Sequence, residues 1–195
     1  MNNTPSHTAH LDAQTGVGQR LLVLGAGESG IGTAILAQKL GFEVFVSEYD
    51  QPKPQFAEEL EREGIDFEAG KHTEALILNA DLVMKSPGIP PDAPIVQQIR
   101  EAGIPIVSEI EFASRYTTGK IVAITGTNGK TTTTTMTYNI LRDGGLDVCM
   151  AGNIGNSFAR ELAKRDFDYW VLEVSSFQLE DIDTFRPHIA LIHNL

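Results

Sequence analysis

The sequence has one cysteine, few basic residues and no long apolar run. Cys149 alone can form neither an internal disulfide nor a cysteine cluster for zinc, which suits a reducing compartment. No apolar run approaches the roughly 20 residues that a membrane helix needs. With 15 Lys and Arg against 26 Asp and Glu, the net charge of -11 argues against nucleic-acid binding, which depends on clustered basic side chains. These absences predict a cytoplasmic protein with neither a membrane nor a nucleic acid as partner.

The start of the chain also lacks the apolar stretch of a signal peptide. We therefore expect residues 1–19 to be a mobile leader. The full length of 195 residues, 42% of them hydrophobic, is enough for one large domain or two small globular ones.

Short apolar runs alternate with amphipathic stretches from residue 21 onward, as in successive βα units on a parallel sheet. The first series predicts strands at 21–25, 43–48, 81–86 and 104–109, a weaker one near 66, and helices at 30–40, 54–63, 94–102 and 109–116. A second series predicts strands at 120–126, 147–152, 169–175 and 188–195, and helices near 130–143 and 156–165. The sequence therefore predicts an α/β protein with a Rossmann-like, doubly wound domain over 20–116 and a P-loop α/β domain over 117–195.

The second series ends on an apolar run, "IALIHNL", that reads as a strand. A parallel sheet presents ligand-binding groups in the loops beyond the carboxyl ends of its strands. We therefore expect the second domain to be incomplete and the chain to be the front part of a longer protein.

The stretch "ITGTNGKT" places a glycine-rich turn between a predicted strand and a predicted helix. Backbone N–H groups of such a turn, with the helix N-terminus, bind phosphate oxygens. Lys130 would extend to the β- and γ-phosphates, and the Thr131 hydroxyl would ligate Mg²⁺. Ile124 stands where the general P-loop pattern has glycine, so a structural turn with a solvated lysine is the alternative. The expected nucleotide-binding residues are Gly126, Thr127, Asn128, Gly129, Lys130, Thr131 and Thr132.

Glu173 follows the apolar run Trp170-Val171-Leu172. A buried acid is costly without a partner, and nucleotide loops usually work with a metal-binding acid at the end of a neighbouring strand. We expect Glu173 to ligate the metal together with Thr131, and a structural ion pair is the alternative. The sequence has no D-x-x-G or N-K-x-D segment, which weakens a GTPase interpretation.

A second glycine turn occurs in "LLVLGAGESG", where Gly25, Gly27 and Gly30 have the G-x-G-x-x-G spacing and Glu48 ends the next predicted strand. This is the dinucleotide fingerprint, in which the acid accepts from a ribose hydroxyl. It does not single out NAD, because any nucleotide diphosphate could bind such a turn. The segment "KSPGI" would form another loop at the same sheet edge, and a turn without a ligand is the alternative.

Six stretches together resemble the Mur ligases, the ATP-dependent amide ligases that build the peptide of bacterial cell-wall precursors. In chain order they are "GAGESG", "KSPGI", "EIEFASR", "ITGTNGKTTTT", "AGNIGNSF" and "VLEVSSFQLE". "GTNGKT" is specific to this superfamily and its folylpolyglutamate relatives, and "GNIG" followed by "SSFQLE" resembles the member that adds D-glutamate. The resemblance extends over residues 21–195.

The resemblance implies a carbon–nitrogen ligase of peptidoglycan synthesis with ATP and Mg²⁺ as cofactors. ATP would phosphorylate the carboxylate of UDP-N-acetylmuramoyl-L-alanine, and the amine of D-glutamate would attack the acyl phosphate. Lys130 and Glu173 would be the catalytic residues, and we expect a monomer. The residues implied for the UDP-precursor are Gly27, Glu28 and Ser29 at the pyrophosphate, Glu48 and Tyr49 near the uracil or ribose, Ser86, Pro87 and Gly88 closing the pocket, and Asn153, Ser175 and Gln178 at the muramoyl-alanine end.

The family continues beyond the stretches found here with a metal-binding histidine, a carbamylated lysine and a third domain. His193 precedes the position expected for that histidine and is interpreted as a core or edge residue. We therefore expect this chain alone to be inactive as a ligase. Two other functions stay open: a non-catalytic nucleotide-binding module, and an NAD-dependent oxidoreductase, which would leave Gly126–Thr131 unexplained.

Overall fold

The computed structural model describes residues 16–194 of the chain. Most of the expected leader, residues 1–15, lies outside the described residues. Residues 16–18 form a turn at which Gly16 N donates to Leu40 O at 2.9 Å. Within residues 16–194, no helix combines the length and the apolar character needed to cross a bilayer.

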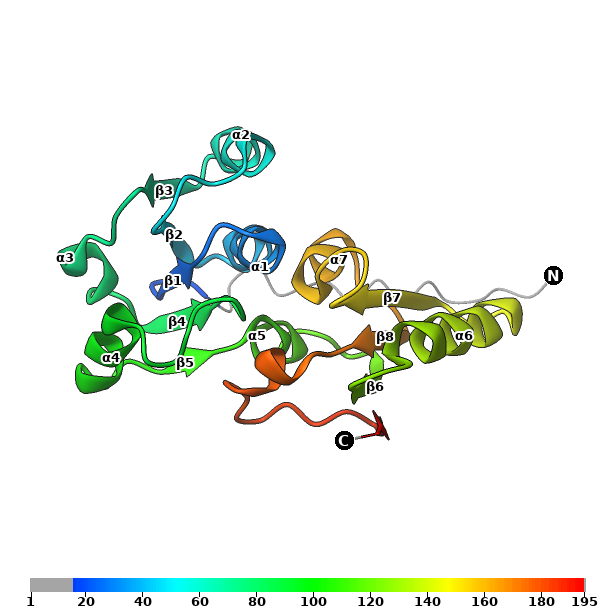
Figure 1. Ribbon diagram of the computed structural model, residues 1–195. Helices are drawn as coiled ribbons and strands as arrows, with labels where there is room; N and C mark the ends of the chain where they lie inside the picture. The colour runs from blue at the N-terminus through cyan, green and yellow to red at the C-terminus, as the bar shows by residue number, and fades with distance from the viewer. Residues whose placement is uncertain (1–15, 195) are drawn as a thin grey trace.

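The first half of the chain forms a five-stranded parallel sheet with the order β3-β2-β1-β4-β5 (Figure 1). The chain begins in the middle of the sheet, runs outward through β2 and β3, and crosses back to β4, so β1 and β4 flank a topological switch point. The strands are β1 Arg20–Leu24, β2 Glu43–Glu48, β3 Asp66–Ala69, β4 Leu82–Lys85 and β5 Ile106–Val107, and the helices are α1 Glu28–Lys39, α2 Pro54–Glu63, α3 Glu74–Ile77, α4 Pro94–Glu101 and α5 Glu109–Ser114.

The apolar run of β1 is buried on both faces of this sheet, as the βα alternation predicts. Leu21 and Val23 belong to one core cluster, whereas Leu22 and Leu24 belong to another on the opposite face. The doubly wound α/β fold expected from the sequence is therefore confirmed.

The second half forms a four-stranded parallel sheet with the order β7-β8-β6-β9. Trp170, the largest fully buried side chain, lies on its central strand β8. The elements are β6 Lys120–Gly126, α6 Lys130–Asp143, β7 Val148–Gly152, α7 Phe158–Lys164, β8 Tyr169–Glu173, the 3₁₀ helix η1 Ser176–Leu179 and β9 Ile189–His193.

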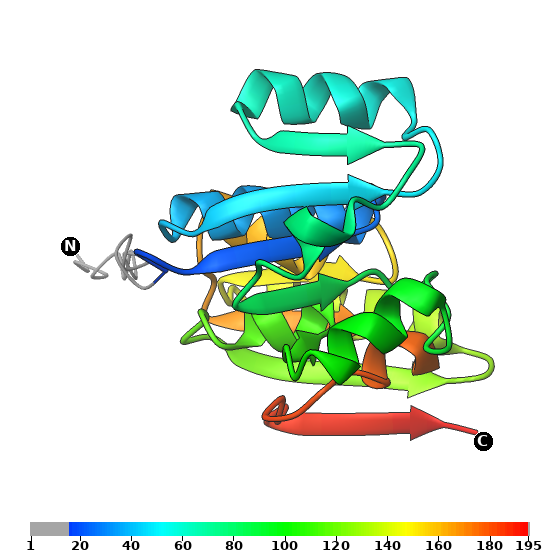
Figure 2. The same ribbon diagram turned by 90° about the vertical axis from the view of Figure 1, so that its left-hand side faces the viewer.

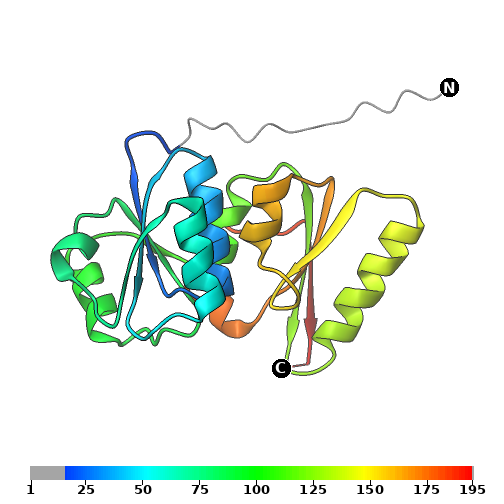
Figure 3. The same cartoon turned by 90° about the horizontal axis from the view of Figure 1, so that it is seen from above.

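Helices α1 and α7 pack against each other and join the two sheets (Figure 3). A Cβ atom on Gly32 would overlap Ser157 Oγ and lie 2.9 Å from Arg160 N, so the two backbones approach closely at this glycine. Arg160 also forms ion pairs with Glu28 and Glu59. One cluster of buried residues includes side chains from both sheets, so the two halves share a core.

The strands of both sheets run in the same direction, as Figure 2 shows, so their carboxyl ends open on one side of the molecule. Because parallel sheets bind ligands beyond the carboxyl ends of their strands, both candidate sites lie on this side.

Two details of the sequence prediction are wrong. The strand expected at 104–109 covers only Ile106–Val107, because Ser108 caps α5 by accepting a hydrogen bond from Glu111 N at 3.2 Å. The short helices α3 and η1 are additional elements, each four residues long.

Candidate functional site

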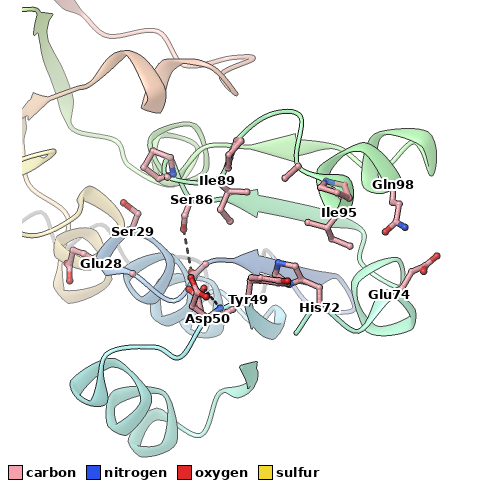
Figure 4. Close-up of a pocket in the computed structure, with 18 residues that line it drawn as sticks. Glu28, Ser29, Tyr49, Asp50, His72, Glu74, Ser86, Ile89, Ile95 and Gln98 are labelled. Carbon is pink, nitrogen blue, oxygen red and sulfur yellow. Dashed lines mark hydrogen bonds between the residues drawn. The ribbon is translucent and has the colours of Figure 1, made fainter. Parts of the chain in front are cut away.

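A cavity of about 890 Å³ opens at the carboxyl edge of the first sheet, at the switch point between β1 and β4 (Figure 4). All eight residues expected there from the sequence lie in its lining. These are Gly27, Glu28, Ser29, Glu48, Tyr49, Ser86, Pro87 and Gly88. Three loops therefore converge on one cavity: the turn after β1, the segment after β2 and the loop after β4.

The glycine turn after β1 has no room for side chains at two positions. Gly25 has φ +94°, and a Cβ atom there would lie 2.7 Å from Ser86 Oγ. A Cβ atom on Gly30 would overlap the carbonyl oxygen of Gly25. Helix α1 begins at Glu28, so the turn brings the unpaired N–H groups of its first residues to the cavity wall. A diphosphate could bind to these groups.

Two of the predicted acids already have partners within the protein. The Glu28 carboxylate accepts from Arg160 Nε at 2.6 Å and Ser157 N at 3.1 Å, so it is directed toward α7. Glu48 accepts from Ala26 N at 2.7 Å with one oxygen and from Asp50 N at 3.1 Å with the other. Glu48 therefore holds the glycine turn in place, and its direct contact with a ribose or base stays a prediction.

The aromatic ring of Tyr49 lies beside that of His72 at the far end of the cavity, with 5.5 Å between the ring centroids (Figure 4). The sequence analysis missed His72, although "KHT" follows a weakly predicted strand of the same sheet. Its Nδ1 lies 2.7 Å from Ser47 Oγ, which donates to Glu68 at 2.8 Å. Burial lowers the pKa of His72, with the carboxylates of Glu68 and Glu48 acting in the opposite direction. The lowered pKa favours the neutral imidazole, whose ring can stack on a planar base.

The second candidate site is the loop between β6 and α6. Gly126 and Gly129 have φ +131° and +85°, and a Cβ atom on Gly126 would overlap the carbonyl oxygen of His193. Lys130, the first residue of α6, donates from Nζ to Gly126 O at 2.6 Å and Thr127 O at 3.3 Å. The ammonium group is thus held over the turn, and a phosphate bound there would compete with two carbonyl groups for it.

Thr131 and Glu173 meet beneath this loop, as the sequence predicts. Thr131 Oγ1 donates to Glu173 Oε2 at 2.7 Å, and Asn153 Nδ2 donates to Glu173 Oε1 at 2.8 Å. Glu173 is only 3% exposed, and among the described residues no Lys, Arg or His forms an ion pair with it. This carboxylate is therefore held by neutral donors, contrary to the ion-pair alternative.

The side chains that meet beneath the loop offer oxygen atoms, the kind of ligand that Mg²⁺ prefers. Mg²⁺ typically binds one or two protein oxygens and completes its coordination with phosphate and water. Thr131 Oγ1 and the Glu173 carboxylate can supply such oxygens beside a phosphate loop.

Ser175 and Gln178 form a capping box at the start of η1. Ser175 N donates to Gln178 Oε1 at 3.0 Å, and Gln178 N donates to Ser175 Oγ at 3.4 Å. Gln178 is 3% exposed. The two side chains therefore shape the turn after β8, and their contact with a ligand stays a prediction.

His193 lies on the edge strand β9, opposite Gly126 in the register of β6 and β9. Its Nε2 is 2.6 Å from Thr133 Oγ1 on α6. The sequence analysis treated His193 as a core or edge residue and missed this contact with the phosphate-loop helix. The parallel pairing of β9 with β6 brings the two together.

Comparison with known families assigns both halves of the chain. The sequence model of the Mur ligase MurD-like N-terminal domain matches residues 19–108, and that of the Mur ligase middle domain matches residues 124–195. The chain belongs to the Mur ligase family. The two Mur ligase matches leave α5 and the start of β6 between them, and the domain boundary near residue 117 stays a prediction.

This Mur ligase chain is similar to proteins named UDP-N-acetylmuramoylalanine--D-glutamate ligase. The one from Bacteroides fragilis is 52% identical over 177 residues, which are 91% of this chain and 40% of that protein. The one from Porphyromonas gingivalis is 53% identical over 175 residues, which are 90% of this chain and 39% of that protein. The chain thus spans about 40% of the length of these curated relatives.

Solved structures of other Mur ligases have the same fold. The UDP-N-acetylmuramate:L-alanyl-gamma-D-glutamyl-meso-diaminopimelate ligase from Neisseria meningitides has a TM-score of 0.61 at 22% identity, over 91% of this chain and 60% of that one. The UDP-N-acetylmuramate-alanine ligase MurC from Thermotoga maritima has a TM-score of 0.57 at 23% identity, over 89% of this chain and 41% of that one. At these identities the likeness supports the Mur ligase fold alone.

Proposed function

We propose that the chain provides the UDP-binding site and the phosphate loop of a ligase that adds D-glutamate to UDP-N-acetylmuramoyl-L-alanine with ATP. The relatives with 52% and 53% identity are named for this reaction, and they extend well beyond the matched region. ATP and Mg²⁺ are the proposed cofactors, a monomer the proposed state and the cytoplasm the proposed location.

The pairing of Thr131 with Glu173 beneath the glycine loop is the observation that carries this proposal. A hydroxyl and a buried carboxylate 2.7 Å apart, next to a lysine at a helix N-terminus, match the metal and phosphate ligands of nucleotide loops. A plain strand-to-helix turn gives no reason to bury Glu173 without a cation. The NAD-dependent alternative accounts for neither residue.

The residues of this loop suit the activation of a carboxylate. A carboxylate is a poor electrophile until one of its oxygens becomes a leaving group, and phosphorylation requires two anions to approach each other. Lys130 would offset part of this negative charge with its ammonium group, while the loop N–H groups orient the phosphates. Bound Mg²⁺ would supply further charge neutralisation.

The first cavity is the proposed site of the UDP group. Gly27, Glu28 and Ser29 would bind the diphosphate through backbone N–H groups, and Tyr49 with His72 would stack on the base. Ser86, Pro87 and Gly88 would form the opposite wall. The carboxyl edges of both sheets face the same side (Figure 2), so an extended precursor could have its nucleotide in this cavity and its carboxylate near Lys130.

Calorimetric titration of the chain with UDP, with NAD, and with ATP in the presence and absence of Mg²⁺ tests the proposal. We expect binding of UDP, no binding of NAD, and weak ATP binding that requires Mg²⁺. Glu173→Gln should weaken the Mg²⁺-dependent binding of ATP while leaving UDP binding unchanged, because Glu173 lies in the second site. Tight NAD binding without UDP binding would contradict the proposed function.

A further inference from the structure

A fully buried lysine connects the first cavity to the second half of the chain. Lys85, the last residue of β4, has a side chain that is 0% exposed, and its Nζ lies 3.0 Å from Asp181 Oδ2. Asp181 follows η1 and is itself only 10% exposed. The two residues are far apart in the sequence, so this ion pair depends on how the two sheets are placed.

Lys85 also holds the loop that follows it. Its Nζ donates to Ile89 O at 3.1 Å, which closes the loop Ser86–Ile89 from the inside. Ile89 N donates to Ser86 O at 3.1 Å, and Ser86 Oγ donates to Gly25 O at 3.4 Å (Figure 4). One ammonium group therefore fixes the loop that carries the Ser86–Gly88 wall of the cavity.

Asp181 cannot readily follow a movement of this loop, because it is held from other directions. Its carbonyl oxygen accepts from Ser108 N at 2.8 Å, and its Oδ1 lies 3.7 Å from Arg100 Nη2. Two residues further on, Asp183 N donates to the buried carboxylate of Glu111 at 3.0 Å. The segment around Asp181 thus gives Lys85 a fixed anchor.

Packing alone does not account for this ion pair. A buried pair of charges costs so much desolvation that apolar side chains of similar volume are often as stabilising or more so. The ion pair instead restricts the conformation of the loop, because an ammonium group with two oxygen partners at about 3 Å allows few loop positions.

We propose that Asp181 is a positioning residue for the nucleotide cavity: acting through Lys85, it sets the Ser86–Gly88 wall and makes nucleotide affinity depend on the segment that follows β8. That segment begins directly after Glu173, the acid of the phosphate loop, so the two sites share one element. The identity of the ligand as UDP rests on the proposed function, whereas the control of the wall by Asp181 does not.

Three variants test this proposal on the whole chain. Asp181→Asn keeps the size and removes the charge, and the double variant Lys85→Met/Asp181→Leu replaces the pair by apolar side chains. Asp147→Asn is the matched control, because Asp147 forms an exposed ion pair with Arg165, and neither residue lines the cavity. Each variant is compared with the parent in UDP affinity by calorimetry, in thermal midpoint, and in amide hydrogen exchange of Ile89.

We expect Asp181→Asn to weaken UDP binding at least tenfold and to speed exchange of the Ile89 amide at least tenfold, while Asp147→Asn changes neither. The double variant should recover the thermal midpoint of the parent but not its UDP affinity or its slow Ile89 exchange. If the double variant also recovered the UDP affinity and the slow Ile89 exchange of the parent, the ion pair would only support packing, and the proposal would be overturned. If the parent does not bind UDP, the proposed function fails, and the Ile89 exchange rates still decide whether Asp181 positions the wall.

Discussion

Glu109 and Glu111 lie two residues apart on α5, and both are fully buried. Their surroundings shift the pKa values of the two carboxyl groups in opposite directions. Burial raises the pKa of Glu109 to about 7, only partly opposed by the hydrogen bond from Ala159 N, and its Oε2 has no partner among the described residues. Burial also acts to raise the pKa of Glu111, but hydrogen bonds from Thr184, from Arg115 and from further backbone N–H groups outweigh it and hold the pKa at about 2.

Glu109→Gln should flatten the pH dependence of stability. Because the folded-state pKa of Glu109 is raised from 4.5 to about 7, its contribution is fully present below pH 4.5 and is lost as the pH rises through 7. This loss amounts to roughly 3 kcal/mol, which Gln avoids because it is never charged. Urea unfolding at pH 5 and pH 8 measures the effect, with the exposed Glu43→Gln as control. An equal pH dependence in Glu109→Gln and the parent would contradict the prediction.

Lys130→Ala should weaken ATP binding by about 2–4 kcal/mol, since the ammonium group would pair with phosphates in a partly desolvated loop. Lys130→Arg should not restore it, because a planar guanidinium does not fit a point contact. Titration of ATP with Mg²⁺ into each variant measures the loss, and Lys164→Ala, whose lysine is 57% exposed, is the control. Unchanged ATP affinity in Lys130→Ala would mean that the loop is structural.

At the scale of elements, the contact of α1 with α7 depends on one glycine. Gly32→Ala should lower the free energy of unfolding by about 1–3 kcal/mol, because the added Cβ overlaps Ser157 Oγ, even though alanine favours a helix by about 1 kcal/mol. Ser157→Ala removes the overlapping oxygen. In a double-mutant cycle measured by thermal unfolding, Ser157→Ala should therefore offset part of the loss, and strictly additive effects would exclude this contact as the cause.

The sequence predicts a helix or strand correctly where its hydrophobic pattern extends over enough residues to show a period or a continuous apolar run. The strands β1 and β8 each contain a continuous apolar run, and the phosphate loop has its residues adjacent in the chain. Thr131 and Glu173 could be paired in advance because Glu173 ends one strand of a parallel sheet and Thr131 lies just beyond the end of the neighbouring strand. The ion pair of Lys85 with Asp181 could not, because it depends on how one sheet is placed against the other. The four-residue helices α3 and η1 are too short to show a period.

At the scale of the whole molecule, β9 is an edge strand with apolar side chains exposed. Ile189 and Ile192 are 60% and 61% exposed, and within residues 16–194 only β6 pairs with this strand. Exposed apolar edges promote pairing between chains, and a lysine on the edge opposes it.

The proposed state is a monomer, so Ile192→Lys should reduce only the self-association that this exposed edge promotes at high concentration. Sedimentation velocity of the parent and of Ile192→Lys over a range of concentrations measures the difference. Ile182→Lys, a substitution at an apolar residue that is 39% exposed outside any strand, is the control. The edge would not be the contact if both variants or neither reduced association.

The two sheets run in the same direction, so under the proposed function the spacing between their carboxyl edges would select ligands by length. Under the proposed function, a free nucleotide would occupy the first cavity, but only a molecule of matching span would bring its far end to Lys130 while its diphosphate stays at Gly27. Because α1 and α7 pack against each other, the spacing between the two sheets is fixed before a ligand binds. Precursors with a shortened or lengthened linker should keep their nucleotide affinity and still be misplaced at the phosphate loop.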